Sequence, residues 1–251
     1  MGPLLHQTAL VTGAAKRIGK AIAIAIAASG ADVAITYRES QAEAERTVAE
    51  LRAHGVRAGG YPCDLRSPES IRHTVNAVAS DFGRLDLLVN NAGIFETAAL
   101  EAITVSQWDA MFETNTRAPF LTSQAALPYL KAARGRIINI GSLGGIHPWP
   151  THAHYCTSKA ALHMLTATMS KAFAPEISVN CVAPGMIATN GNTSTRGSGE
   201  ETAAEYEHFA QRTPMRRNGT SQDVAEAVLF FATGPHFITG QLLAVDGGLG
   251  L

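Results

Sequence analysis

Near its start, the 251-residue chain reads Thr8-Ala9-Leu10-Val11-Thr12-Gly13-Ala14-Ala15-Lys16-Arg17-Ile18-Gly19. The apolar run predicts a buried strand, and the alanine-rich pattern that follows predicts a helix. A glycine-rich turn between a first strand and a first helix directs backbone N–H groups and the positive helix end toward a pyrophosphate. We therefore expect Gly13, Ile18 and Gly19 to lie against a dinucleotide. Arg17 stands where a middle glycine is usual, so its side chain would turn away from the pyrophosphate and add positive charge beside the cofactor.

Short apolar runs alternate with longer helical patterns along the rest of the chain. The predicted strands are Thr8–Thr12, Val33–Tyr37, Gly59–Pro62, Leu85–Asn90, Arg136–Ile140, Ser178–Val182 and Gln241–Val245. The predicted helices are Ile18–Ser29, Gln41–His54, Pro68–Phe82, Ser106–Ala133, Thr151–Phe173 and Ser221–Phe231. Most strands are apolar throughout, as in a parallel sheet buried on both faces. The pattern predicts an α/β fold with an open, doubly wound parallel sheet and right-handed crossovers. No linker or repeat divides it, so we expect a single domain over residues 1–251.

Composition indicates a globular protein and excludes several function classes. Charged residues are 16% and hydrophobic residues 46% of the chain, which argues against disorder. A formal net charge of −1 argues against nucleic-acid binding. No apolar run approaches the roughly 20 residues that span a membrane, and no signal peptide is visible, so we expect a cytoplasmic protein with no membrane partner. The three cysteines, Cys63, Cys156 and Cys181, include no Cys-x-x-Cys pair and are expected to be buried free thiols.

The end of the second predicted strand bears on the choice of cofactor. Proteins that bind NAD usually place a carboxylate there for the ribose 2′-hydroxyl. Here Tyr37 holds that position and Arg38 follows, with Ser40 two residues further on. A guanidinium suits a 2′-phosphate, and Tyr37 or Arg17 would stack on adenine or share the charge. We therefore expect NADP(H), although Glu39 favours NAD(H) instead.

The next two strand ends carry further candidate cofactor residues. Asp64, followed by Leu65, would accept a hydrogen bond from the adenine amino group. Alternatively, Asp64 caps a helix or shapes a turn, and Ser67 competes for the cap. After the fourth strand come Asn91-Ala92-Gly93, whose small residues suit close approach of the backbone to a ligand or an ordinary turn.

A Tyr-x-x-x-Lys pair predicts proton transfer. Tyr155 and Lys159 are four residues apart, so they share one face of a helix. A phenol ordinarily titrates near pH 10, and a neighbouring ammonium lowers that pKa by stabilising the phenolate. Such a tyrosine can exchange a proton with a substrate oxygen near neutral pH. Ser142, thirteen residues upstream, would hold the same oxygen by a hydrogen bond. The alternative for Tyr155 and Lys159 is a solvated surface pair.

Taken together, these motifs resemble the short-chain dehydrogenase/reductase family over essentially the whole chain. The matching positions are Thr12-Gly13, Ile18-Gly19, Asp64, Asn90 to Gly93, Asn115, Ser142, Tyr155, Lys159, Asn180, Pro184-Gly185, Thr239-Gly240 and Asp246 to Gly248. The resemblance implies a Rossmann fold with a seven-stranded sheet, a nicotinamide cofactor and a homotetramer. The tetramer would assemble through the helices in Ser106–Ala133 and Thr151–Phe173.

The same resemblance implies roles for individual residues. Tyr155 would be the proton donor, and Lys159 would lower its pKa and hold the nicotinamide ribose hydroxyls. Ser142 would orient the substrate oxygen, and Asn115 would anchor a water molecule in a proton relay that reaches Lys159. The residues expected at the nicotinamide end are Pro184, Gly185, Ile187 and Thr189.

Some features resemble the pteridine-reductase branch of the family. They are Arg17 and the segment Ala174 to Asn180, and Phe95 would add an aromatic wall for a flat ring. Ser142 departs from this branch, because some pteridine reductases carry aspartate there. We expect His147, Trp149 and His154 to form a further pocket wall. The three histidines of this segment, His147, His152 and His154, are not expected to bind metal, because no carboxylate or cysteine cluster completes a ligand set.

The segment 189–217 is polar and too long for an ordinary connection, so we expect a lid over the ligand rather than a surface insertion. The predicted function is NADPH-dependent reduction of a small-molecule carbonyl, of ketone or 3-oxoacyl type. Reduction of a pterin C=N bond is the alternative, and alcohol oxidation would use the same residues. An NADP(H)-sensing protein without catalysis is a further alternative. It is disfavoured because Asn115, Ser142, Tyr155 and Lys159 are all present.

Overall fold

Seven parallel strands form one sheet in the computed structural model, which describes residues 2–188 and 203–251. The strand order is β3-β2-β1-β4-β5-β6-β9. Their bounds are β1 Thr8–Val11, β2 Asp32–Tyr37, β3 Ala58–Pro62, β4 Leu87–Asn90, β5 Arg136–Ile140, β6 Ser178–Pro184 and β9 Leu242–Val245. All seven predicted strands are confirmed. Strand order reverses between β1 and β4, and such a switch point is where doubly wound sheets bind ligands.

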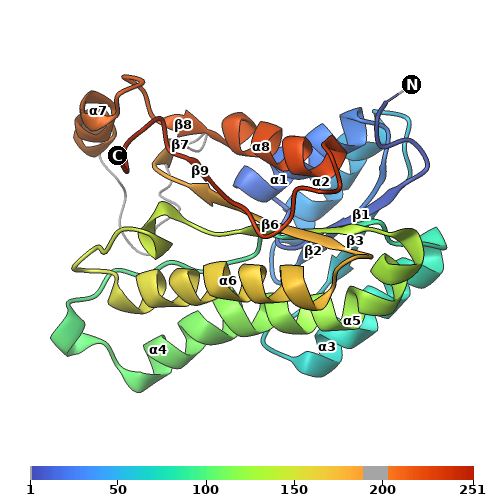
Figure 1. Cartoon of the computed structure of the whole chain (residues 1–251), viewed down its shortest axis with the longest axis horizontal. Coiled ribbons are helices and arrows are strands. Elements are labelled where there is room, and N and C mark those ends of the chain that lie inside the picture. The colour runs from blue at the N-terminus through green and yellow to red at the C-terminus, as the bar shows by residue number, and fades with distance from the viewer. Residues whose placement is uncertain (1, 189–202) are drawn as a thin grey trace.

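Helices cover both faces of the sheet (Figure 1), which confirms the predicted doubly wound Rossmann fold. One face carries α1 (Arg17–Ala28), α2 (Gln41–Arg52) and α8 (Ser221–Thr233). The other carries α3 (Pro68–Phe82), α5 (Ala118–Ala133) and α6 (Ala153–Ala172), with α4 (Val105–Phe112) beside α6. Each face has its own apolar core. Ile22 and Val228 are buried in one, and Val75, Leu130 and Met169 in the other.

The predicted helix over Ser106–Ala133 is helical from end to end, but it is not one uninterrupted α-helix. A π-helical turn, Glu113–Arg117, separates α4 from α5. Within it, the side chain of Asn115 accepts a hydrogen bond from the Ile94 backbone N–H (2.9 Å) and donates one to the Ile94 carbonyl (3.0 Å). A π turn places an extra residue in a helix, and such turns occur often at functional sites. Here it brings Asn115 onto the loop that follows β4.

Several short elements escaped the sequence analysis. They are β7 (Ile187–Ala188), β8 (Gly219–Thr220), α7 (Ala203–Arg212) and the short 3₁₀ turns Leu100–Ala102 and Leu143–Gly145. Strands of two residues carry no periodic signal, and α7 lies inside the segment predicted as a lid. Residues 189–202 of that segment lie outside the described residues.

Three further predictions concern composition. Cys63, Cys156 and Cys181 are free and buried, as expected. Through residues 2–188 and 203–251, no helix is long and apolar enough to cross a membrane. In the same part of the chain, His, Cys, Asp and Glu form no group of three that is suited to a metal ion.

Candidate active site

The glycine turn after β1 is held against the end of β4. The Asn91 amide donates hydrogen bonds to the carbonyls of Thr12 (2.9 Å) and Gly13 (3.1 Å). In return, Thr12 Oγ1 accepts from the backbone N–H groups of Asn91 (3.0 Å) and Ala92 (3.1 Å). Gly13 has φ of +62°, and a Cβ there would lie 2.8 Å from the Ala92 Cβ. Only glycine fits this left-handed, crowded position, so the turn has the close backbone approach that a pyrophosphate cradle needs.

A cavity of about 220 Å³ lies beside this turn, at the carboxyl ends of the strands. Eight of the predicted cofactor residues line it, namely Gly13, Tyr37, Arg38, Ser40, Asp64, Leu65, Ala92 and Gly93. The cavity is also lined by Thr36, Cys63, Arg66, Ile94 and Thr114, none of which was predicted to bind the cofactor. The position beside the glycine turn suits the adenosine half of a dinucleotide.

Two guanidinium groups face this cavity. Arg38 pairs with Glu39 (2.9 Å), and Arg66 pairs with Asp64 (3.2 Å). Hydrogen bonds from Arg66 hold the pKa of the Asp64 carboxyl below its ordinary value. Arg66 was missed, although its place two residues after Asp64 was a signal in the sequence. Both arginine side chains are more than 45% exposed, so they can turn toward a ligand phosphate.

Two further predictions near this cavity concern the cap of α3 and the position of Arg17. Ser67, not Asp64, caps α3, because its side chain accepts from the Ser70 N–H. Arg17 begins α1 with φ of 57°, is exposed, and does not line this cavity or the one that follows.

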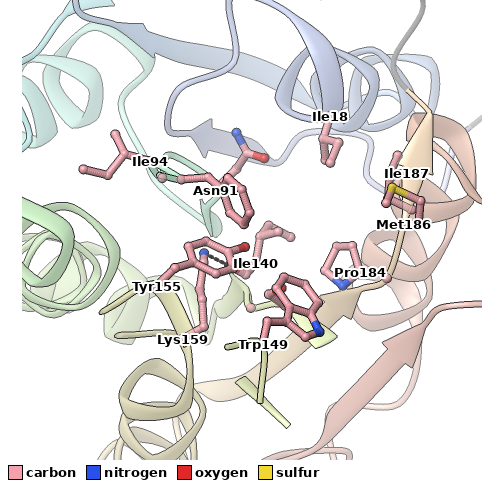
Figure 2. A pocket seen from close by; sticks show the side chains of 15 residues that line it. Ile18, Asn91, Ile94, Ile140, Trp149, Tyr155, Lys159, Pro184, Met186 and Ile187 are labelled. Atoms are coloured by element: carbon pink, nitrogen blue, oxygen red, sulfur yellow. Dashed lines mark hydrogen bonds between the residues drawn. The ribbon is translucent and has the colours of Figure 1, made fainter. Parts of the chain in front are cut away.

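A second cavity, of about 160 Å³ (Figure 2), is lined by three of the four predicted catalytic residues, Ser142, Tyr155 and Lys159, but not by Asn115. Gly93 and Ile94 border both cavities, so the two adjoin. Its other lining residues are Ile18, Asn91, Phe95, Ile140, Gly141, Ser142, Trp149, Tyr155, Lys159, Pro184, Gly185, Met186 and Ile187. Of these, Met186, Ile140 and Gly141 were not predicted to lie at the site. Thr189, predicted beside Ile187, lies outside the described residues.

Lys159 holds its ammonium in a buried position at the base of this cavity. Its side chain donates a hydrogen bond to the Ile140 carbonyl (2.8 Å), and the residue is 4% exposed. Burial lowers the pKa of Lys159 to about 8, because a desolvated ammonium is disfavoured. A Cβ on Gly93 would lie 3.5 Å from Lys159 Nζ and 3.1 Å from Asn115 Oδ1. The Lys159 and Asn115 side chains therefore converge on the same glycine.

Ser142 lines the cavity and has a hydroxyl with donor capacity left. Its Oγ accepts a hydrogen bond from the Gly144 N–H (3.1 Å). Through residues 2–188 and 203–251, no acceptor takes the Ser142 O–H itself. A hydroxyl that already accepts one bond and still has its hydrogen to give is suited to donate to a ligand oxygen.

Aromatic rings enclose Tyr155. The Phe95 ring meets it edge-on at 4.5 Å between centroids, and the Trp149 ring lies nearly parallel to it at 6.1 Å. Figure 2 shows Trp149, Tyr155 and Lys159 around one space, with Pro184 and Met186 on its far side. Lys159 Nζ lies 6.0 Å from the Tyr155 ring centroid, close enough to favour the phenolate. The predicted substrate residues Phe95 and Trp149 thus lie against Tyr155.

The third predicted substrate residue, His147, lines an adjoining cavity of about 540 Å³. Trp149, Gly185 and Met186 border this cavity and the catalytic one. Its remaining lining residues are Leu143, Pro148, Thr151, His152, Phe209, Arg212, Leu249, Gly250 and Leu251. Two of these, Phe209 and Arg212, belong to α7 in the predicted lid segment.

The prediction that His154 forms part of this wall is wrong. Its side chain is fully buried and faces Glu96, with 3.9 Å between Nε2 and Oε2. Burial lowers the pKa of His154, since the charged ring is desolvated. His152 lies in the wall instead, because α6 begins at Ala153 and leaves His152 outside the helix.

Comparison with known proteins agrees with this geometry. Residues 13–250 match the family model described as enoyl-(acyl carrier protein) reductase. A 3-oxoacyl-[acyl-carrier-protein] reductase from Synechocystis is 36% identical over 99% of each chain. A short-chain dehydrogenase from Burkholderia cenocepacia, solved in complex with NADP, is 38% identical over the full length of both chains, with a TM-score of 0.90. A blue fluorescent protein from a metagenomic library, solved with NADPH, is 35% identical over 99% of this chain and 100% of its own, with a TM-score of 0.90.

The fold and the site define a dinucleotide-dependent oxidoreductase. Within that class, the chain belongs to the short-chain dehydrogenase/reductase family.

Proposed function

We propose that this protein is an NADPH-dependent carbonyl reductase that acts on ketones of the 3-oxoacyl type. One observation carries the proposal: the cavity that holds Ser142, Tyr155 and Lys159 adjoins a cavity that presents two arginines beside a glycine turn. The first has the groups that protonate a carbonyl oxygen, and the second suits a 2′-phosphorylated nucleotide. The relatives named above act on 3-oxoacyl groups or bind NADP(H).

The residues would divide the binding of the cofactor between the two cavities. Arg38 and Arg66 would hold the 2′-phosphate, and the N–H groups of the turn at Gly13 would receive the pyrophosphate. Lys159 would bind the nicotinamide ribose, while Pro184 and Ile187 would contact the ring. When bound, NADPH supplies the hydride that reduces the carbonyl carbon.

Side chains of the protein would supply the proton that the carbonyl oxygen takes up. Ser142 would donate a hydrogen bond to the carbonyl oxygen and orient it toward Tyr155. As the carbon gains the hydride, the Tyr155 hydroxyl would release its proton to the oxygen, and the product is an alcohol. The positive charge on Lys159 would stabilise the phenolate that remains. Asn115, which meets Lys159 at Gly93, would support the water path that returns a proton to Tyr155.

The shape of the site supports a substrate with a small head and a longer tail. The catalytic cavity is small, about 160 Å³, and it is walled by Phe95 and Trp149. The adjoining cavity of about 540 Å³ offers Leu143, Pro148 and Phe209 to an apolar tail. The segment 189–217, whose described part includes α7, would act as the lid over this tail.

The aromatic wall also supports a second candidate, reduction of a pterin. Phe95 offers a flat ring 4.5 Å from Tyr155, which suits stacking on a planar substrate. This reaction would use the same Tyr155 proton.

The test is NADPH oxidation by the purified protein with two substrate sets, β-keto esters with 3-oxoacyl thioesters, and dihydropterins with dihydrofolate. We expect turnover of the first set. Turnover of the pterins alone would replace the proposal with the second candidate.

The Tyr155→Phe variant serves as the control for chemistry. It should lose about 10²–10⁴-fold in kcat, because the general acid is removed, while the Kd for NADPH is kept. If neither substrate set is turned over while NADPH still binds, the result would favour an NADP(H)-sensing protein without catalysis.

We also propose a homotetramer in the cytoplasm. Two separate regions expose large apolar side chains, one with Trp108, Phe120 and Met164, the other with Phe237 and Leu243. Two self-complementary interfaces on one chain generate a tetramer with dihedral symmetry. Burying these side chains between copies would remove them from water.

A further inference from the structure

His163, which the reaction scheme above does not use, lies directly behind Ser142. It is on α6, one helical turn after Lys159, and its ring points at the loop that follows β5. The backbone N–H of Ser142 donates a hydrogen bond to His163 Nε2 at 3.4 Å. No other side chain in residues 2–188 and 203–251 bonds the Ser142 backbone N–H.

Two glycines make room for this ring. A Cβ at Gly141 would overlap His163 Nε2, and a Cβ at Gly145 would lie 2.5 Å from His163 Cε1. Gly141 directly precedes Ser142, and Gly145 ends the short turn Leu143–Gly145 that follows it. The path of the loop that carries Ser142 is therefore shaped around the imidazole.

The bond from Ser142 defines the protonation state of His163. A backbone N–H can only donate, so Nε2 must accept and the neutral ring carries its proton on Nδ1. Burial and the nearby Lys159 charge lower the pKa of His163 to about 4, while hydrogen bonding to the Gly145 backbone opposes them. The ring is thus neutral near pH 7 and keeps Nε2 as an acceptor.

The hydrogen bonds of the Ser142 backbone N–H and of the Ser142 hydroxyl both involve the short loop after β5. While Nε2 holds the backbone N–H, Ser142 Oγ accepts from the Gly144 N–H at 3.1 Å, within the same turn. Together the two bonds fix Ser142 at the wall of the cavity that contains Tyr155 and leave its O–H available to donate there.

We propose that His163 is a positioning residue, whose Nε2 holds the Ser142 backbone so that the Ser142 hydroxyl meets the substrate oxygen. The expected effect of His163 on turnover rests on the proposed function. The hydrogen bond between His163 and the Ser142 backbone does not depend on it. A displacement of a reacting group by about 1 Å is sufficient to cost on the order of 100-fold in rate.

Substitution of His163 by glutamine or by asparagine distinguishes the role of Nε2 from that of Nδ1. A glutamine amide reaches about as far along the side chain as Nε2, and an asparagine amide about as far as Nδ1. We therefore expect His163→Gln to retain kcat within about threefold. His163→Asn should lose about 10–100-fold in kcat, with the KM for NADPH unchanged. Equal kcat values for these two variants would overturn the proposal.

If His163 acts by positioning Ser142, the loss of kcat in His163→Asn must depend on the Ser142 hydroxyl. In the Ser142→Ala background, His163→Asn should reduce the residual kcat by less than about threefold, since the hydroxyl it positions is absent. A loss as large as in the parent enzyme would show a general structural role and would overturn the proposal.

Hydrogen–deuterium exchange at the Ser142 amide, read by fragmentation mass spectrometry on the full protein, supplies a test without turnover. We expect the amide to be protected in the parent and in His163→Gln, and to exchange at least tenfold faster in His163→Asn. If the Ser142 amide shows these differences in protection but the protein is inactive on every substrate, the proposed function is refuted and the positioning role of His163 is not. Unchanged protection in His163→Asn would overturn the positioning role.

Discussion

Lys159 keeps its positive charge in the site at a cost to stability. Its pKa is lowered from 10.5 to about 8, so the folded protein binds this proton less tightly than the unfolded chain does. Below pH 8 the folded state must hold a desolvated ammonium, and this cost is relieved as the pH rises from 8 to 10.5.

We therefore predict that Lys159→Met stabilises the cofactor-free protein while it abolishes turnover. At pH 7 the free energy of unfolding should rise by roughly 1–3 kcal/mol, and this advantage should shrink between pH 8 and 10.5. Chemical denaturation across pH measures it. The exposed Lys131→Met is the control and should change stability by less than about 0.5 kcal/mol. A Lys159→Met protein less stable than the parent at pH 7 would contradict the argument.

Arg38 is the residue on which the choice between NADPH and NADH should depend. Its guanidinium borders the adenosine-side cavity and is half exposed, so a phosphate can replace Glu39 as its partner. We predict that Arg38→Ala raises the Kd for NADPH about 10–100-fold and that for NADH less than about threefold. Fluorescence titration of both cofactors measures this. The exposed Arg46→Ala on α2 is the control, and equal losses for both cofactors would refute the assignment.

At the scale of elements, a buried amide network joins the strands to α6 beneath the site. The Asn90 amide donates to Asn139 Oδ1 on β5 (2.8 Å) and to Ser123 Oγ on α5 (3.2 Å). Asn139 in turn donates to Thr166 Oγ1 on α6 (2.8 Å). This network ties β4, which leads to Gly93, to the helix that carries Tyr155 and Lys159.

We predict that Asn139→Ala destabilises the protein by about 2–3 kcal/mol, because it leaves a cavity and removes two hydrogen bonds from buried partners. The matched control is Gln222→Ala on the exposed face of α8, which should change the free energy of unfolding by less than about 0.5 kcal/mol. Denaturation in urea compares the two. Similar values would mean that the network contributes little.

The elements differ in how far local sequence could predict them. Strands and long helices followed from apolar runs and helical periodicity, because burial on both faces of a parallel sheet demands continuous apolar residues. The π turn at Glu113–Arg117 did not, since its cause is the bonding of Asn115 to Ile94, twenty-one residues away in sequence. The exclusion of His154 from the substrate wall depended likewise on packing against Glu96.

At the scale of the whole molecule, two apolar surfaces remain exposed on the single chain. On one, Trp108 is 38% and Phe120 43% exposed, beside a cavity of about 660 Å³. On the other, Phe237 is 98% exposed, and β9 is the last strand of the sheet, with an outer edge that pairs with no strand in residues 2–188 and 203–251. Each surface is suited to a second copy of the chain.

We predict that Trp108→Glu and Phe237→Glu each convert a tetramer to dimers and that the double variant is monomeric, because a charge buried at an interface is unfavourable. Sedimentation velocity measures the mass, and Arg46→Glu on α2 serves as the control. A parent protein that sediments as a monomer would contradict the proposed assembly.

Local sequence was sufficient for the sheet and the glycine turn, because periodicity and turn chemistry act over a few neighbouring positions. Residue spacing also singled out Ser142, Tyr155 and Lys159, which line one cavity in the structure and whose catalytic roles are proposed above. Packing alone brought Arg66 to the adenosine-side cavity and Met186 to the catalytic one. It also brought His163 behind Ser142, with a pKa lowered by burial. These contacts and desolvation costs arise between segments distant in sequence, so they exist only once the chain has folded.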